Sequence, residues 1–128
     1  MTTEPTITKV HEDSRGEMYS ILLSGDRELM LLHSKAGSLR GGHSHDVPES
    51  IMVLTGKMHY SKRNPVSGFS HRDFLTEGDC SYNPSAEIHM GDFPEDTWLI
   101  EWKHAKKGEW KNENYGPWRE KVDANARS

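Results

Sequence analysis

The sequence has little cysteine and no long apolar run. Cys80 is its one cysteine, so no disulfide can form within the chain, and we expect a reducing, cytoplasmic location. No stretch approaches the roughly 18 uncharged apolar residues that a transmembrane helix needs. The polar N-terminal stretch also lacks the apolar core of a secretion signal. We therefore expect no membrane partner and no export.

Positive charge is scarce as well. Lys and Arg number 16 against 20 Asp and Glu, which leaves a net charge of −4. Nucleic-acid-binding proteins usually carry a basic patch or stripe, so we expect no nucleic-acid partner. The length of 128 residues fits one domain. We predict a single domain over 1–128, with a core at about 15–103 and a C-terminal tail at 104–128.

Short runs rich in β-branched and aromatic residues are abundant instead. The expected strands cover residues 6–10, 16–23, 27–34, 49–54, 57–62, 69–75, 80–83, 86–90 and 96–102. Gly, Pro, Asn and Asp separate these runs, and we interpret the glycine-rich stretch 36–42 as a turn. Many short strands with frequent turn signals indicate an all-β sandwich or barrel.

The tail differs from the strand-rich part. It is polar and carries three large aromatic residues, Trp110, Tyr115 and Trp118. Residues 118–126 could form one or two helical turns. Two interpretations stay open: the rings anchor the tail on the barrel or on a second subunit, or the tail is only partly ordered and held by a few rings.

The stretch HSHDVPE, residues 43–49, places two histidines close to a glutamate. If residues 43–53 form one extended strand, then His43, His45 and Glu49 point to the same side as Ile51 and Val53. Two histidines and one carboxylate can bind a divalent metal ion and leave coordination positions for water or substrate. The segment therefore predicts a metal site above an apolar floor.

A tight turn follows this segment at Thr55 and Gly56. We expect a β-hairpin there, although its register could slip by one residue. In the expected register, Tyr60 points to the same side as Glu49, while His59 points away. Tyr60 is therefore our candidate catalytic residue near the metal ion.

The spacing in this region resembles the first signature motif of the cupin superfamily. The matching positions are Gly37, His43, His45, Glu49 and Gly56. The second cupin motif resembles a later segment, with matches at Gly78, Pro84 and His89. That segment departs from the family at two positions, where Ala86 replaces a frequent glycine and Phe93 a frequent asparagine.

The resemblance implies a cupin β-barrel of the jelly-roll type, with a polar, partly ordered C-terminal tail. It also implies that His43, His45, Glu49 and His89 bind one divalent metal ion, either Zn, Fe, Mn or Ni. The alternative is a cupin relative that keeps the histidines but works without metal. His11, His33, His71 and His104 are interpreted as surface or packing residues.

Two short motifs point toward sugar chemistry. Asp13, Arg15 and Gly16 resemble the opening strand of cupin-type nucleotide-sugar epimerases and ketoisomerases, and RGGHSH at 40–45 is similar to a segment of 3,4-ketoisomerases and capsular-polysaccharide epimerases. Arg40, or Arg15, could hold a phosphate or an enolate oxygen. The resemblance implies an isomerase or epimerase that acts on a small polar metabolite such as a keto-sugar.

Two other classes remain open, because one fold supports many functions. One is a non-haem iron dioxygenase of a small organic substrate, and the other is a cupin that binds a small ligand without turnover. The stretches 16–23 and 96–102 are apolar enough on both faces to suggest contact with a second copy. We therefore expect a homodimer with a small-molecule ligand.

Overall fold

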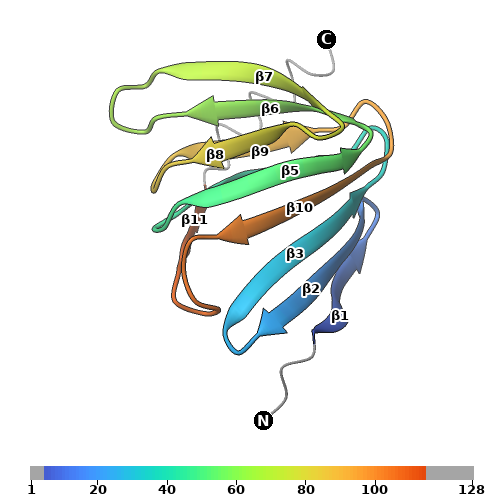
Figure 1. Ribbon diagram of the computed structural model, residues 1–128. Helices are drawn as coiled ribbons and strands as arrows, with labels where there is room; N and C mark the ends of the chain where they lie inside the picture. The colour runs from blue at the N-terminus through green and yellow to red at the C-terminus, as the bar shows by residue number, and fades with distance from the viewer. Residues whose placement is uncertain (1–4, 115–128) are drawn as a thin grey trace.

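The computed structural model describes residues 5–114, which form two antiparallel sheets that face each other as a sandwich (Figure 1). The six-stranded sheet has the order β1-β2-β3-β10-β5-β8. Its strands are β1 (Thr6–Asp13), β2 (Gly16–Ser24), β3 (Arg27–Ser34), β10 (Thr97–Lys103), β5 (Glu49–Thr55) and β8 (Cys80–Asn83). None of the described residues lies in a helix long and apolar enough to span a bilayer.

The five-stranded sheet has the order β11-β4-β9-β6-β7. Its strands are β11 (Asn112–Asn114), β4 (Leu39–His45), β9 (Ile88–Asp92), β6 (Lys57–Arg63) and β7 (Ser70–Thr76). The described strands build an all-β jelly-roll sandwich, as predicted, and the two sheets stay separate layers rather than closing into one barrel. Consecutive strands often lie in opposite sheets, so residues from distant parts of the sequence meet between the layers.

Each of the nine strands expected from the sequence is present, and two further strands were missed. The stretch read as a turn at 36–42 contains the start of β4, where Gly41 and Gly42 have φ of 100° and 82°. Glycines in that conformation usually mark turns, but here they lie within a strand that is irregular at this point. The second missed strand, β11, lies in the tail and pairs with β4.

The expected hairpin through Thr55 and Gly56 is wrong. β5 pairs with β10 and β8, whereas β6 pairs with β7 and β9, so the chain crosses from one sheet to the other at Gly56. Gly56 has φ of 94°, and a Cβ there would lie 2.5 Å from the carbonyl oxygen of Asp96. Glycine is needed at this crossing because any side chain would meet backbone.

The expected single strand over 43–53 is also wrong. β4 ends at His45, residues 46–48 carry the chain across, and β5 begins at Glu49 in the opposite sheet. Both strands nevertheless direct alternate side chains into the space between the sheets, as the burial of His45, Glu49, Ile51 and Val53 shows. The alternation therefore predicted the correct faces although the pairing was different.

The core between the sheets has an apolar part and a polar part. The apolar part consists of buried side chains from both sheets, namely Leu32, Ile51, Val53, Met58, Tyr60, Leu75, Phe93 and Leu99. Burial of each such large side chain contributes about 1.5–3 kcal/mol to folding. The polar part adjoins it and contains Glu49, His45 and His89, which are almost completely buried. Such groups need partners or a ligand when they leave water.

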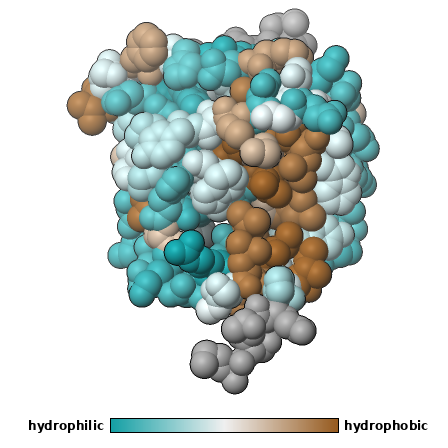
Figure 2. Space-filling model, in the orientation of Figure 1, coloured by the Kyte–Doolittle hydropathy of each residue, from teal (hydrophilic) through white to brown (hydrophobic). Residues whose placement is uncertain are grey.

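The outer face of the six-stranded sheet is unusually apolar. Figure 2 shows hydrophobic side chains gathered over this side of the molecule. Along β5 and β10 the residues that alternate with the core, including Met52, Trp98, Ile100 and Trp102, are only half-buried in the isolated chain. Leu54, at the end of β5, is exposed. A surface of this kind often contacts a partner.

Candidate metal centre

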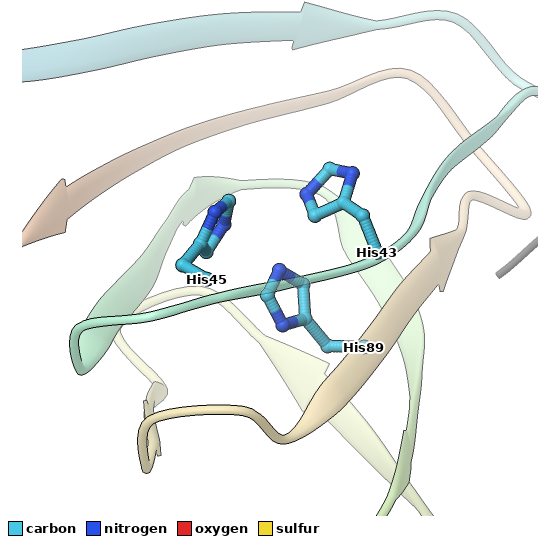
Figure 3. Close-up of side chains that lie close together, drawn as sticks. All are labelled: His43, His45 and His89. Atoms are coloured by element: carbon cyan, nitrogen blue, oxygen red, sulfur yellow. The ribbon is translucent and has the colours of Figure 1, made fainter. Parts of the chain in front are cut away.

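Three histidines point toward one another between the sheets (Figure 3). His43 and His45 come from β4 and His89 from the neighbouring strand β9, where it pairs with His43. The ring centroids are 4.8–5.1 Å apart. One ligand nitrogen from each ring lies within 4.8 Å of the others, close enough for a single ion to reach all three.

The close approach of β4 and β9 depends on a glycine. A Cβ at Gly41 would lie 2.7 Å from the carbonyl oxygen of His89, so a larger residue would push the two strands apart. The β4 register shifts between Gly41 and His43. Period-two alternation then turns the side chains of both His43 and His45 to the same interior face.

Glu49 approaches the histidines from the opposite sheet. Its side chain is only 1% exposed, with Oε2 3.2 Å from His45 Nε2 and Oε1 3.2 Å from His89 Nε2. Lys103 Nζ lies 2.9 Å from Glu49 Oε2. The fold thus brings together all four residues that the motifs suggested, and their role as metal ligands remains a prediction.

The protonation states of His43, His89 and Glu49 suit a divalent ion. Burial, followed by the neighbouring His89, lowers the pKa of His43 to about 3, and burial lowers that of His89 to about 4. Burial acts to raise the pKa of Glu49, but His45 and Lys103 outweigh it and hold that pKa at about 2. Neutral imidazoles and an ionised carboxylate are the forms that bind metals.

Two atoms of the cluster, His89 Nε2 and Glu49 Oε1, make no hydrogen bond with the described residues and are available to bind a metal ion. His89 Nε2 and Glu49 Oε1 are buried and lie 3.2 Å apart, yet they are not aligned as hydrogen-bond donor and acceptor. Buried polar atoms without such partners are rare in folded proteins and call for an explanation. Lone pairs that converge on a common ion provide one, so the residues present fit a divalent metal.

A cavity of about 190 Å³ lies beside the histidines. His43, His89 and Tyr60 line it together with apolar side chains from both sheets, among them Met18, Leu32, Ile51, Met58, Phe93 and Leu99. His59 is not among the lining residues and its ring packs on Phe74, with 4.9 Å between ring centroids. Tyr60 therefore lies where we expected, although the hairpin argument that placed it there was wrong.

The Tyr60 hydroxyl accepts a hydrogen bond of 2.6 Å from Asn83 Nδ2. Burial, followed by the negative charge of Glu49, raises the pKa of Tyr60 well above its usual value. The phenol is therefore neutral at physiological pH and serves as a hydrogen-bonding group rather than as a base. Its catalytic role remains a prediction.

The two arginines suggested by the sequence both line the cavity. The Arg40 guanidinium donates hydrogen bonds to Ser34 Oγ at 2.6 Å and to the carbonyl oxygen of His33 at 3.1 Å. Arg15 is held by Asp13, to which its guanidinium donates at 2.6 Å. Both cations are thus oriented by hydrogen bonds within the protein, and the role of Arg40 in holding an anion remains a prediction.

Two charged residues of β10, Glu101 and Lys103, were not predicted from the sequence to belong to the site. Glu101 lines the cavity, and burial, followed by the charge of Glu49, raises its pKa to about 7. Burial acts to lower the pKa of Lys103, but Glu101 and Glu49 reverse that effect and raise it. A signal existed: in TWLIEWK the residues Trp98, Ile100 and Trp102 share one face, so Glu101 and Lys103 must share the other.

The tail covers His45 and Lys103 at the candidate metal centre. Trp110 packs edge-on against His45, with 5.3 Å between ring centroids, and Lys103 Nζ lies 4.2 Å from the centre of the Trp110 ring. Trp110 thus anchors the start of the tail on the sandwich, which both interpretations of the tail allow. Tyr115, Trp118 and the helical turns expected at 118–126 lie outside the described residues.

The remaining histidines that we interpreted as surface or packing residues make contacts away from the cavity. His33 stacks on Trp98 and lies 2.9 Å from Glu17, and His104 lies 2.8 Å from Ser50 Oγ. His11 and His71 each contact a nearby aspartate.

The sequence matches no family model and no curated protein, whereas the fold has many solved counterparts. The capsular polysaccharide assembling protein CapF from Staphylococcus aureus matches with a TM-score of 0.73 and 18% identity, over 85% of this chain and 31% of that chain. A mutant of Bacillus subtilis oxalate decarboxylase matches with a TM-score of 0.72 and 19% identity, over 94% and 35%. This chain spans about a third of their length.

A third counterpart is Drosophila melanogaster CENP-C in a protein complex, with a TM-score of 0.63 and 10% identity, over 78% of this chain and 76% of that chain. At these identities the likeness establishes the fold alone. The two sheets, their order and the solved counterparts agree with the motifs at 37–56 and 78–89. The chain therefore has the jelly-roll fold of the cupin superfamily, with a histidine triad positioned to hold a metal ion.

Proposed function

We propose that the protein is a metal-dependent enzyme that moves a proton on a small anionic metabolite containing a carbonyl group, as an isomerase or epimerase does. One observation carries the proposal. The cluster of His43, His45, Glu49 and His89 adjoins a small cavity, which His43, His89 and Glu101 line. Enolisation needs an acid–base group and stabilisation of the enolate oxygen, and a metal ion beside the substrate can supply the second.

A divalent ion held by these four residues would supply a Lewis acid that polarises a substrate oxygen. The carboxyl group of Glu101, whose pKa is raised to about 7 in the metal-free protein, would accept and return the proton. Tyr60 offers a neutral hydroxyl for a hydrogen bond to the substrate. Arg40 and Arg15 would hold an anionic group of the substrate at the other end.

The cavity limits the size of the substrate. A volume of about 190 Å³ is below the roughly 300–1,000 Å³ of pockets that enclose drug-sized ligands. A small keto-sugar or keto acid fits this space, whereas a nucleotide sugar would extend beyond it. The likeness to a capsular polysaccharide assembling protein is compatible with carbohydrate chemistry but does not define the substrate.

The alternative function is a non-haem iron dioxygenase of a small organic substrate. Three histidines with one carboxylate beside a cavity also suit iron(II) and dioxygen. A cupin that binds its ligand without turnover is the further alternative, because one fold supports many functions.

One experiment separates these possibilities. The metal-free protein is loaded in parallel with Zn, Mn, Ni and Fe(II), and each form is incubated in D₂O with small keto acids and keto-sugars. Proton NMR then follows exchange at the carbon beside the carbonyl, and an oxygen electrode follows dioxygen uptake. Exchange that disappears in Glu101→Gln supports the proposal, dioxygen uptake with iron supports the dioxygenase, and the absence of both contradicts enzymatic function on these substrates.

A homodimer is also proposed, and the support is the apolar outer face of the six-stranded sheet. The side chains of Met52, Trp98, Ile100 and Trp102 form a continuous strip across β5 and β10. A second copy of the same face would cover this strip by two-fold symmetry.

A further inference from the structure

Lys103 is a buried cation at the candidate metal centre that the proposed reaction does not use. Its side chain is 10% exposed, and Nζ lies 2.9 Å from Glu49 Oε2 and 3.8 Å from Glu101 Oε1. Lysine is among the residues least often buried, because its ammonium group loses strong hydration. Its presence beside a candidate metal ligand therefore has a cost that a functional role would explain.

The surroundings hold the ammonium group in place. The Trp110 ring lies 4.2 Å from Lys103 Nζ and covers it from the tail side, which gives a cation–π contact in a desolvated setting. Lys103 is not among the residues that line the cavity. A ligand in the cavity would therefore be affected by the charge of Lys103 through Glu49 rather than by direct contact.

This charge changes the electrostatic balance of the centre. Imidazole ligands bind a metal ion in their neutral form, so the Glu49 carboxylate alone among the four candidate ligands would offset one of the two positive charges of a divalent ion. Because the Lys103 ammonium lies 2.9 Å from Glu49 and offsets its charge, the ion, its four ligands and Lys103 together keep two positive charges, which the neighbouring Glu101 reduces only when it is ionised. Charges in a low-dielectric interior interact strongly, so an anion that enters from the cavity is favoured over a neutral ligand.

We propose that Lys103 sets the ligand preference of the metal centre and makes it select small anions, such as carboxylates, from the cavity. This inference rests on the metal site of the proposed function, but not on the reaction assigned to it. Arg40 adds a buried positive charge on the cavity wall, whereas the charge of Arg15 is paired with Asp13.

The test uses azide as the probe and cobalt(II) as a visible metal ion. Cobalt-loaded wild type, Lys103→Gln and Lys103→Arg are titrated with azide, and visible absorption gives the dissociation constant. Lys57→Gln, which removes an exposed lysine of β6, is the matched control for the loss of one charge. Cobalt affinity is measured separately by competition with a chelator.

We expect azide to bind about tenfold more weakly to Lys103→Gln, which corresponds to about 1.4 kcal/mol. Lys103→Arg and Lys57→Gln should resemble wild type, and cobalt should bind Lys103→Gln at least as tightly, because a repulsive cation is gone. Unchanged azide affinity in a cobalt-loaded Lys103→Gln protein overturns the inference. Loss of cobalt binding in that variant also overturns it, since Lys103 would then only support Glu49.

Two further outcomes keep the test decisive. If Lys103→Gln does not fold, the same titration is made with Trp110→Leu, which removes the ring that holds the Lys103 ammonium group. The azide affinity of this variant should be severalfold lower than that of wild type. An unchanged azide affinity overturns the inference. If wild type binds no cobalt, the metal site of the proposed function fails first. If wild type binds cobalt but Lys103→Gln and wild type bind azide equally well, this inference alone fails.

Discussion

The Glu101 carboxyl group should make the stability of the metal-free protein depend on pH. Burial raises the pKa of Glu101 from its ordinary 4.5 to about 7. A carboxyl whose pKa is higher in the folded protein binds more protons there than in the unfolded chain. Stability is therefore lost as pH rises from about 4.5 through 7, and the loss is complete above that window.

The size of this effect follows from the two pKa values. Their difference corresponds to about 3 kcal/mol well above pH 7, since one pKa unit is about 1.4 kcal/mol. At pH 5 most of that cost is absent, because Glu101 is still protonated in the folded protein. Allowing for relaxation around Lys103, we expect Glu101→Gln to gain about 2 kcal/mol of stability relative to wild type between pH 5 and pH 8.5.

Urea unfolding in the presence of a chelator measures this difference. Wild type and Glu101→Gln are unfolded at pH 5 and pH 8.5, and the free energies of unfolding are compared at each pH. Glu77→Gln, at an exposed position, is the control and should behave like wild type at both values. A stability difference between wild type and Glu101→Gln that is the same at pH 5 and pH 8.5 would refute the reasoning.

Three further predictions concern the fold and its assembly. Tyr60→Phe should lower the free energy of unfolding by about 1–3 kcal/mol in urea titration, because it leaves the buried Asn83 amide without its partner; no loss would show that this hydrogen bond is unimportant. Gly56→Ala should destabilise by about 3 kcal/mol or more, or prevent folding, since φ is 94° and Asp96 blocks the new methyl group; near-wild-type thermal stability would contradict this. Light scattering should report a dimer for wild type and a monomer for Ile100→Glu, whereas a monomeric wild type at micromolar concentration would contradict pairing.

The candidate metal ligands were largely predictable because their pattern is local. His43, His45 and Glu49 lie within seven residues, and alternation with Ile51 and Val53 indicated a buried face. The fourth residue, His89, is 40 positions beyond Glu49, so its approach depends on the pairing of β4 with β9. Only the resemblance to the cupin motifs could suggest it.

Sheet pairing was less predictable, because it depends on contacts between distant residues. The turn at Gly56 has the local features of a hairpin, yet in this sandwich it carries the chain from one sheet to the other. β4 was missed because Gly41 and Gly42 are typical of turns, whereas here the positive φ of Gly41 and its close approach to His89 require glycine within a strand.

Glu101 and Lys103 illustrate a different limit. Alternation in TWLIEWK places both on the buried face of β10, but alternation does not tell which groups they will meet. Lys103 pairs in register with Glu49, which begins a strand more than 50 residues earlier in the sequence. Their function could therefore be inferred only once β10 was known to lie beside β5.

The metal content of the purified protein tests the central claim most directly. Protein prepared without an affinity tag is incubated with a divalent ion, freed of excess metal and analysed by elemental mass spectrometry. The arrangement of His43, His45, Glu49 and His89 predicts one ion per chain in wild type and in the control His59→Ala, and a clear loss in His89→Ala. A wild-type protein that retains no ion, or a folded His89→Ala protein that retains one at wild-type affinity, would contradict the assignment of this site.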